Sequence, residues 1–159
     1  MNNLISLKEV SKFFTNNKKI LVLKKINYSF KKGKIYSLMG PSGSGKSTLL
    51  NILSMIDKPT SGSLLIDSKK INFSETVIND KIRSKKIGII YQQNNLLPDF
   101  TALENVYLAN LALSNHKQTA IEKAKKIIKK MSLSSREHHY PSELSGGEMQ
   151  RIAIARALI

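Results

Sequence analysis

The sequence contains no cysteine, and this absence excludes several kinds of protein. Neither a disulfide framework nor a metal site with thiolate ligands can form without cysteine, and the absence suits a reducing compartment. No apolar run approaches the ~20 residues that a membrane-spanning helix needs. The first ten residues, MNNLISLKEV, lack the basic and apolar regions of a secretory signal peptide. We therefore expect a protein that reaches a membrane only through a partner.

Acidic residues are also scarce, with 11 against 26 lysines and arginines, so the formal net charge is +15. Such an excess of positive charge suggests nucleic acid or an anionic membrane surface as a binding partner. However, 22 of the 26 basic residues are lysines spread through every region, in a chain also rich in isoleucine and asparagine. An AT-rich coding bias would produce the same excess. We therefore favour a solvated basic surface and expect no nucleic-acid partner. At 159 residues the chain is long enough for one domain.

A glycine-rich segment is the most informative part of the chain. Gly40–Ser47 fits the phosphate-binding pattern G-x-x-x-x-G-K-[ST], which would arise by chance in ~1 of 200 chains of this length. Gly43 and Gly45 let the backbone bend sharply and approach a phosphate. The helix that begins near Lys46 directs its positive dipole end at the same anion. Lys46 would reach the β- and γ-phosphates and Ser47 would bind Mg²⁺, so we predict a nucleotide site rather than a plain turn.

Hydrophobic periodicity places this loop in an α/β pattern. It predicts strands over residues 4–10, 20–30, 35–39, 63–67 and 87–91, with a slip of phase near Lys24 and Lys25. It predicts helices from Lys46, from a capping box at Thr101 and Glu104, over about 118–131, and from Ser145. The first helix should turn Leu49, Ile52, Leu53 and Ile56 toward the core. Residues 69–86 read as a polar loop with at most one helical turn.

Two further positions have open interpretations. Phe13 and Phe14 follow the first strand, and an exposed phenylalanine there could stack on a nucleobase, whereas a buried one would belong to the core. Gln92 follows the strand predicted at 87–91. Beside a phosphate site its amide oxygen could bind Mg²⁺ or orient a water molecule, and otherwise it is a loop residue.

The second informative stretch is LSGGEMQRIAIARALI at 144–159. Ser145 and Glu148 form a capping box, so this could simply be a helix with a well-formed start. Gly146 and Gly147 nevertheless cost helix stability, and their missing side chains would let an anion approach the N-terminus. We do not expect two anion-binding helix starts of one monomer to serve the same phosphate, so the pattern suggests two copies facing each other.

With the segment that follows Gln92, these motifs resemble those of ABC-transporter ATPases over essentially the whole chain. The segments that carry the resemblance are Gly40–Leu50, Asp57–Gly62, Leu96–Val106 and Pro141–Glu148. They look most like the ATP-binding subunit of the bacterial lipoprotein-releasing system, and the macrolide-export and cell-division branches share much of the pattern. The resemblance implies a P-loop NTPase fold with a β subdomain and P-loop core (1–92), a helical subdomain (93–144) and a signature helix (145–159).

The resemblance also implies roles for individual residues. Phe14, where the family usually has tyrosine, would stack on adenine, and Ser47 and Gln92 would bind Mg²⁺. The phosphates of ATP would be wrapped by Gly40, Pro41, Ser42, Gly43, Ser44, Gly45, Lys46, Ser47 and Thr48. The opposite subunit of a homodimer would contribute Leu144, Ser145, Gly146, Gly147 and Glu148. Gln92–Phe100 would contact integral-membrane transporter subunits, which places the protein at the cytoplasmic face of the bacterial inner membrane.

The sequence departs from the family after Glu148, because no carboxylate follows it and no histidine follows His139. The family's Mg²⁺-associated aspartate, catalytic glutamate and switch histidine are therefore missing from these residues, and the fold is expected to be incomplete at its C-terminus. We expect this polypeptide alone to bind nucleotide weakly, hydrolyse it negligibly and tend to aggregate. Other interpretations are a non-catalytic remnant and, because of the basic charge, a ribosome-associated ABC protein.

Overall fold

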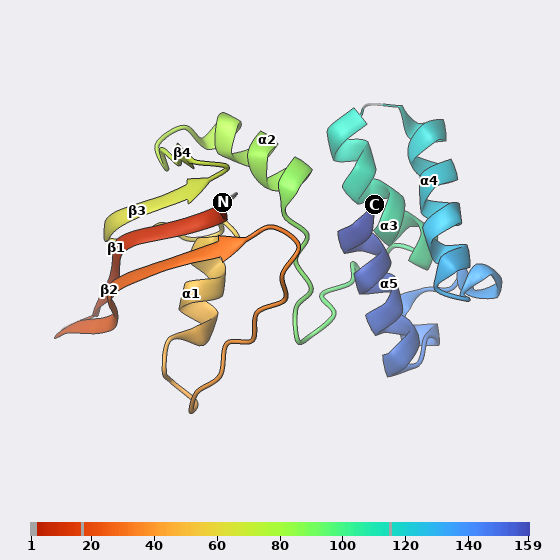
Figure 1. Ribbon diagram of the computed structural model, residues 1–159. Helices are drawn as coiled ribbons and strands as arrows, with labels where there is room; N and C mark the ends of the chain where they lie inside the picture. The colour runs from red at the N-terminus through yellow and green to blue at the C-terminus, as the bar shows by residue number, and fades with distance from the viewer. Residues whose placement is uncertain (1–2, 17, 115) are drawn as a thin grey trace. The chain divides into compact units, whose positions relative to one another are not determined.

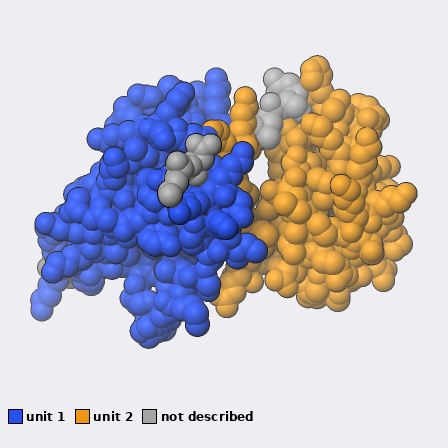
Figure 2. All heavy atoms as spheres, viewed as in Figure 1, with its two compact units in different colours: residues 1–83 blue, residues 84–159 orange. Residues whose placement is uncertain are grey.

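The computed structural model describes residues 3–16, 18–114 and 116–159. The chain divides into two compact units, Met1–Arg83 and Ser84–Ile159 (Figure 2). Each unit has its own buried residues and is described by itself below. The three subdomain ranges expected from the family resemblance stay predictions.

The first unit is built on an antiparallel sheet in the order β2-β1-β3-β4 (Figure 1). Its strands are β1 (Asn3–Asn16), β2 (Lys18–Lys31), β3 (Ser61–Ile66) and β4 (Lys69–Lys70). The register of β1 against β2 shifts between the pairs Val10–Ile26 and Lys12–Leu23. This irregularity confirms the slip of phase predicted near Lys24 and Lys25, because an extra residue in one strand reverses the alternation of its side chains.

The helix α1 (Lys46–Leu53) packs against this sheet. Ile52 is fully buried, but Ile56 is 45% exposed because the helix ends at Leu53. The predicted apolar stripe is therefore correct at Ile52 and wrong at Ile56. Burial of each large aliphatic side chain contributes roughly 1.5–3 kcal/mol to folding. The buried core of this unit includes Leu7, Val10, Leu23, Ile52, Leu64 and Ile66.

Residues 76–86 form the helix α2 (Thr76–Lys86), so the loop predicted over 69–86 is wrong there. The segment is polar and weakly periodic, and specific hydrogen bonds anchor it instead. The buried Asn79 donates from Nδ2 to the carbonyl of Asn72 at 2.8 Å, and Arg83 donates to the carbonyl of Met55 at 3.2 Å. Side-chain hydrogen bonds of this kind leave no periodic signal in the sequence.

The strands predicted at 35–39 and 87–91 are also wrong, because both segments lie outside any strand. Ile35 and Met39 are almost fully exposed, and Ile90 and Tyr91 are exposed as well. An apolar run becomes a strand only when a neighbour pairs with its N–H and C=O groups. In the described part of the chain neither segment has such a neighbour.

The second unit contains the helices α3 (Ala102–Ser114), α4 (Lys117–Lys130) and α5 (Gly146–Leu158), with 3₁₀ turns at Ser134–Arg136 and Pro141–Glu143. These bounds confirm the three helices predicted here. The capping box at the start of α3 is present: the N–H of Thr101 donates to Glu104 at 2.8 Å, and this bond is the largest cause of the lowered pKa of Glu104. The helices pack around Val106, Ala124, Ile128, Leu133, Ile152 and Ala155. No helix among the described residues is both long and apolar enough to cross a bilayer.

Candidate nucleotide-binding site

The phosphate loop has the backbone conformation that its glycines predict. Gly43 and Gly45 have φ angles of +79° and +88°, which L-residues rarely adopt. At Gly43 an added Cβ would meet nothing within 4 Å, so the need for glycine there comes from the backbone. At Gly45 it would lie 3.0 Å from side-chain atoms of Val22 and Leu23, so Gly45 also permits close packing against β2.

The N-terminus of α1 and the side chain of Lys46 together make this loop electropositive. Gly45 caps the helix without any side-chain hydrogen bond, and the first turn contains no acidic residue. The ammonium of Lys46 lies across the loop and donates to the carbonyls of Gly40 at 2.8 Å and Pro41 at 2.7 Å. Unsatisfied N–H groups, the helix dipole and a lysine charge at one place are suited to a phosphate group.

Phe14 lies on β1 and is 46% exposed, while Phe13 is partly buried. The ammonium of Lys12 lies 5.0 Å from the centroid of the Phe14 ring, and that of Lys19 lies 3.8 Å from the centroid of Phe13. Of the two phenylalanines, Phe14 thus has the larger exposed surface for a base. Its role in binding stays a prediction.

Gln92 is exposed and belongs to the second unit, whereas the phosphate loop belongs to the first. A shared Mg²⁺ site of Ser47 and Gln92 therefore stays a prediction. The structure does show how the segment after Gln92 is held. Arg156 on α5 donates to the carbonyls of Asn94 at 2.8 Å and Asn95 at 2.7 Å, and burial lowers the pKa of its guanidinium.

Asn105 on α3 holds the rest of the same segment and is 1% exposed. Its side chain accepts from the N–H of Leu97 at 2.7 Å and donates to the carbonyls of Leu97, Phe100 and Thr101 at 3.0, 2.9 and 3.1 Å. Sequence reasoning missed both Asn105 and Arg156, since their partners are backbone groups. A polar residue on the apolar side of a helix pattern is the signal that could have drawn attention to Asn105.

The signature segment begins α5 as predicted. Ser145 is the N-cap: its hydroxyl accepts from the N–H of Glu148 at 3.3 Å, and its own N–H donates to the Glu148 carboxylate at 2.8 Å. Arg136 donates to the other carboxylate oxygen at 3.0 Å. Leu144 is buried, whereas Gly146 and Gly147 are exposed and an added Cβ at Gly146 would meet nothing within 4 Å. Packing within this unit therefore does not explain the two glycines.

The capping box lowers the pKa of the Glu148 carboxyl, so this group stays ionised at low pH. The N–H and hydroxyl of Ser145, and then Arg136, lower the pKa of Glu148 from 4.5 to about 2. Because the folded-state pKa is the lower one, the unfolded state binds more protons between these values. The stability that Glu148 contributes is therefore complete above about pH 4.5 and is lost as the pH falls toward 2. An NMR titration of the Glu148 carboxyl should show a midpoint near 2, and a midpoint near 4.5 would contradict this. A Glu148→Gln variant should lack the corresponding pH dependence of thermal stability.

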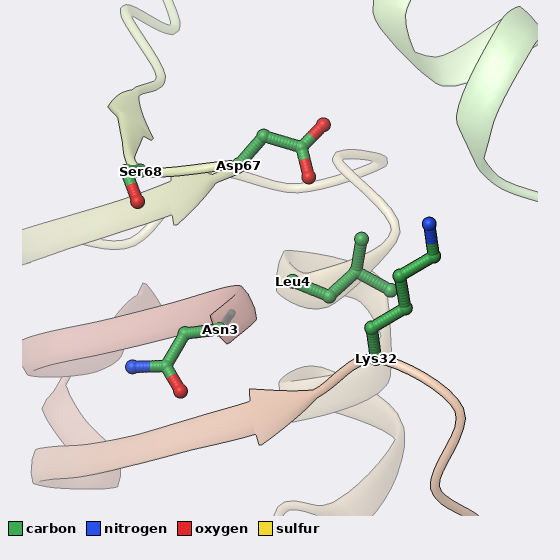
Figure 3. A pocket seen from close by; sticks show the side chains of 5 residues that line it. All are labelled: Asn3, Leu4, Lys32, Asp67 and Ser68. Atoms are coloured by element: carbon green, nitrogen blue, oxygen red, sulfur yellow. The ribbon is translucent and has the colours of Figure 1, made fainter. Parts of the chain in front are cut away.

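A small polar hollow lies at one end of the sheet of the first unit. Figure 3 shows Asn3 and Leu4 at the start of β1, Lys32 just beyond β2, and Asp67 and Ser68 after β3. It contains no residue of the phosphate loop, so it is separate from the candidate nucleotide site.

Comparison with known proteins agrees with this geometry. The sequence profile described as ABC transporter matches residues 23–159. Lipoprotein-releasing system ATP-binding proteins LolD from Rickettsia bellii and Buchnera aphidicola are both 44% identical to this chain, covering 99% and 100% of it and 70% and 71% of their own lengths. A dimeric post-hydrolysis structure of the ATP-binding cassette MJ0796, bound to ADP and Pi, superposes with a TM-score of 0.88 at 43% identity. That match covers 97% of this chain and 68% of the other. The family and fold predicted from the motifs are confirmed: the chain belongs to the ABC transporter family and has the fold of its ATP-binding cassettes.

Proposed function

We propose that this chain is the part of an ABC transporter's ATP-binding subunit that holds the nucleotide. The observation that carries the proposal is the phosphate loop, where glycines with positive φ angles, a helix N-terminus without a side-chain cap and the Lys46 ammonium meet. In this proposal Gly40–Thr48 wrap the phosphates of ATP and Phe14 stacks on adenine. Ser47 and Gln92 have the oxygen ligands that suit Mg²⁺, which would offset the negative charge of the phosphates when bound.

We further propose that two copies close over ATP, each contributing its signature segment to the partner's site. The open surface at Gly146 and Gly147 supports this, because a helix N-terminus with no side chain in the way lets an anion approach its N–H groups. The dimeric state of the similar MJ0796 cassette also supports it.

Residues 92–100 are proposed to contact the membrane subunits at the cytoplasmic face of the inner membrane. Asn105 and Arg156 fix several backbone groups of this segment, so it can transmit a displacement to α3 and α5. The names of the similar LolD proteins support lipoprotein release as the transport process. Macrolide-export and cell-division systems are the alternatives. Negligible hydrolysis by these 159 residues alone stays a prediction.

ATP-dependent association tests the proposal directly. Isothermal titration should show weak binding of Mg·ATP, and sedimentation velocity should show a dimer with Mg·ATP that is absent without it. Gly147→Glu should leave binding by the monomer intact and abolish dimers, since its carboxylate would repel the incoming phosphate. An acidic residue in the first turn stabilises a helix, so this variant should remain folded.

The matched control is Gln150→Glu, which adds the same charge at an exposed position of the same helix. It should still form dimers with Mg·ATP. Absence of any ATP binding by the unmutated protein would overturn the proposed function, and equal loss of dimers in both variants would overturn the role of the signature segment.

A further inference from the structure

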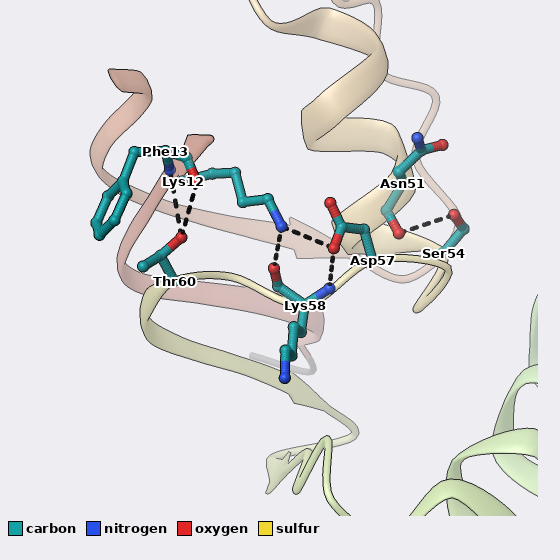
Figure 4. Close-up of polar contacts among 7 residues, drawn as sticks. All are labelled: Lys12, Phe13, Asn51, Ser54, Asp57, Lys58 and Thr60. Atoms are coloured by element: carbon teal, nitrogen blue, oxygen red, sulfur yellow. Dashed lines mark hydrogen bonds and ion pairs between the residues drawn. The ribbon is translucent and has the colours of Figure 1, made fainter. Parts of the chain in front are cut away.

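Lys12 is the one lysine or arginine that is buried in the part of the chain that the structure describes, with 8% of its surface exposed. Burying an ammonium group is costly unless charged or polar partners replace its water. Lys12 has two such partners: Nζ donates to Asp57 Oδ1 at 2.7 Å and to the carbonyl of Lys58 at 2.9 Å (Figure 4). A buried cation with two hydrogen-bond partners at this position calls for an explanation.

The partners of Lys12 belong to the turn that follows α1. The N–H of Asp57 donates to the carbonyl of Asn51 at 3.1 Å, which joins the turn to the helix. The N–H of Thr60 donates to the carbonyl of Ser11 at 2.9 Å, and its hydroxyl accepts from the N–H of Phe13 at 3.3 Å. Residues 57–60 are thus bound both to the helix that starts at the phosphate loop and to β1, and Figure 4 shows the side-chain contacts with Lys12 and Phe13 of β1.

The same ammonium group faces an aromatic ring. Lys12 and Phe14 are two residues apart on β1, and alternate residues of a strand project to the same side. The Lys12 Nζ lies 5.0 Å from the centroid of the Phe14 ring, within the range of a cation–π interaction. Because the cation is held by Asp57 and Lys58, it favours one orientation of the ring. Phe14 still has 46% of its surface exposed for another flat group.

We propose that Lys12 is a positioning residue for the purine base of a nucleoside triphosphate, acting through Phe14. It fixes the ring before the base arrives, so less side-chain entropy is lost on stacking. It also ties the strand that carries Phe14 to the helix that carries the phosphate loop, which matches the base position to the phosphate position. This inference rests on the proposed nucleotide site.

The competing explanation is that Lys12 only neutralises Asp57 and supports the turn after α1. The two explanations differ in which part of the nucleotide is affected. A residue that acts through Phe14 changes the affinity for ATP. It leaves the affinity for inorganic tripolyphosphate unchanged, because tripolyphosphate has no base. A residue that acts only through α1 changes both affinities together.

The experiment measures dissociation constants for Mg·ATP and Mg·tripolyphosphate by isothermal titration. Lys12→Gln keeps a hydrogen-bond donor near Asp57 and removes the charge that faces Phe14. It should weaken ATP binding about three- to tenfold, the range expected when one more side chain has to be immobilised on binding, and change tripolyphosphate binding less than twofold. Lys12→Arg keeps the charge and should retain ATP affinity within about twofold.

Two further variants complete the test. In a Phe14→Ala background, Lys12→Gln should cause no further loss of ATP affinity, because the ring through which it acts is gone. Lys12→Met combined with Asp57→Asn removes both charges, so it carries the test if Lys12→Gln does not fold by circular dichroism. It should show the same selective loss of ATP affinity.

Equal losses for ATP and tripolyphosphate, or no loss for either, would overturn the inference while leaving the proposed function intact. An additive effect of Lys12→Gln and Phe14→Ala would overturn it as well. If the unmutated protein bound neither ligand, the proposed function itself would be wrong and the inference would fall with it.

Discussion

Replacing Lys46 by alanine should weaken the binding of Mg·ATP about ten- to a hundredfold. The ammonium lies across the phosphate loop on the carbonyls of Gly40 and Pro41, which places its charge where the phosphates are proposed to bind. A hydrogen bond to a charged group contributes about 1.5–3 kcal/mol, and each 1.4 kcal/mol is about tenfold in a dissociation constant. Titration calorimetry on the two proteins measures this difference.

Lys34→Ala is the control, because Lys34 is an exposed lysine of the same unit outside the loop. It removes one positive charge without removing a loop contact, so ATP affinity should change less than about twofold. Lys46→Ala should also weaken tripolyphosphate binding by a similar factor to ATP, unlike the Lys12 variants. Equal effects of the two alanine substitutions would show that only the overall positive charge matters.

Replacing Asn105 by leucine should lower the free energy of unfolding by about 2–4 kcal/mol, because four partly buried hydrogen bonds to backbone groups are lost at once. Asn105 is 1% exposed and binds the N–H of Leu97 and the carbonyls of Leu97, Phe100 and Thr101. Leucine has a similar volume, so a cavity contributes little to the loss. Urea unfolding followed by circular dichroism gives the global value. Hydrogen exchange at the amide of Leu97 should speed up, which locates the change in the segment proposed to contact the membrane subunits.

Two further variants serve as comparisons for Asn105→Leu. Asn105→Asp keeps an acceptor for Leu97 but loses the donors to the carbonyls, so it should also be destabilising. Gln118→Leu replaces an exposed amide on α4 and should change stability by less than about 0.5 kcal/mol. A loss for Asn105→Leu no larger than that of Gln118→Leu would show that the segment is held by something other than this side chain.

Much of the candidate site was predictable because its signals are local. The positive φ angles at Gly43 and Gly45 follow from glycine at those positions, and the capping boxes at Thr101 and Ser145 follow from side chains three residues apart. Such features depend on covalent neighbours, so a short stretch of sequence specifies them. The family and fold followed from the same motifs.

Other features depended on strand pairing and side-chain hydrogen bonds that follow no regular spacing in the sequence. The apolar runs at 35–39 and 87–91 had the composition of strands, yet a strand requires a neighbour, and the described residues supply none. The polar segment at 76–86 is a helix that side-chain hydrogen bonds of Asn79 and Arg83 hold in place. The role of Asn105 could not be predicted, because its amide side chain forms hydrogen bonds with backbone groups of a loop.

The sequence by itself determined the phosphate loop, the signature helix and the family, since glycine conformation and helix capping act between residues a few positions apart. Only the tertiary structure decided which apolar runs pair, which phenylalanine has the larger exposed surface, and which side chains hold residues 92–100. It also decided the contacts of Lys12. Its hydrogen-bond partners, Asp57 and Lys58, follow α1 in the chain, whereas the aromatic ring that it faces, Phe14, lies two residues along β1. Several of those choices depend on hydrogen bonds between residues far apart in the sequence, such as Lys12 with Asp57 and Arg156 with Asn94, and no local pattern records them.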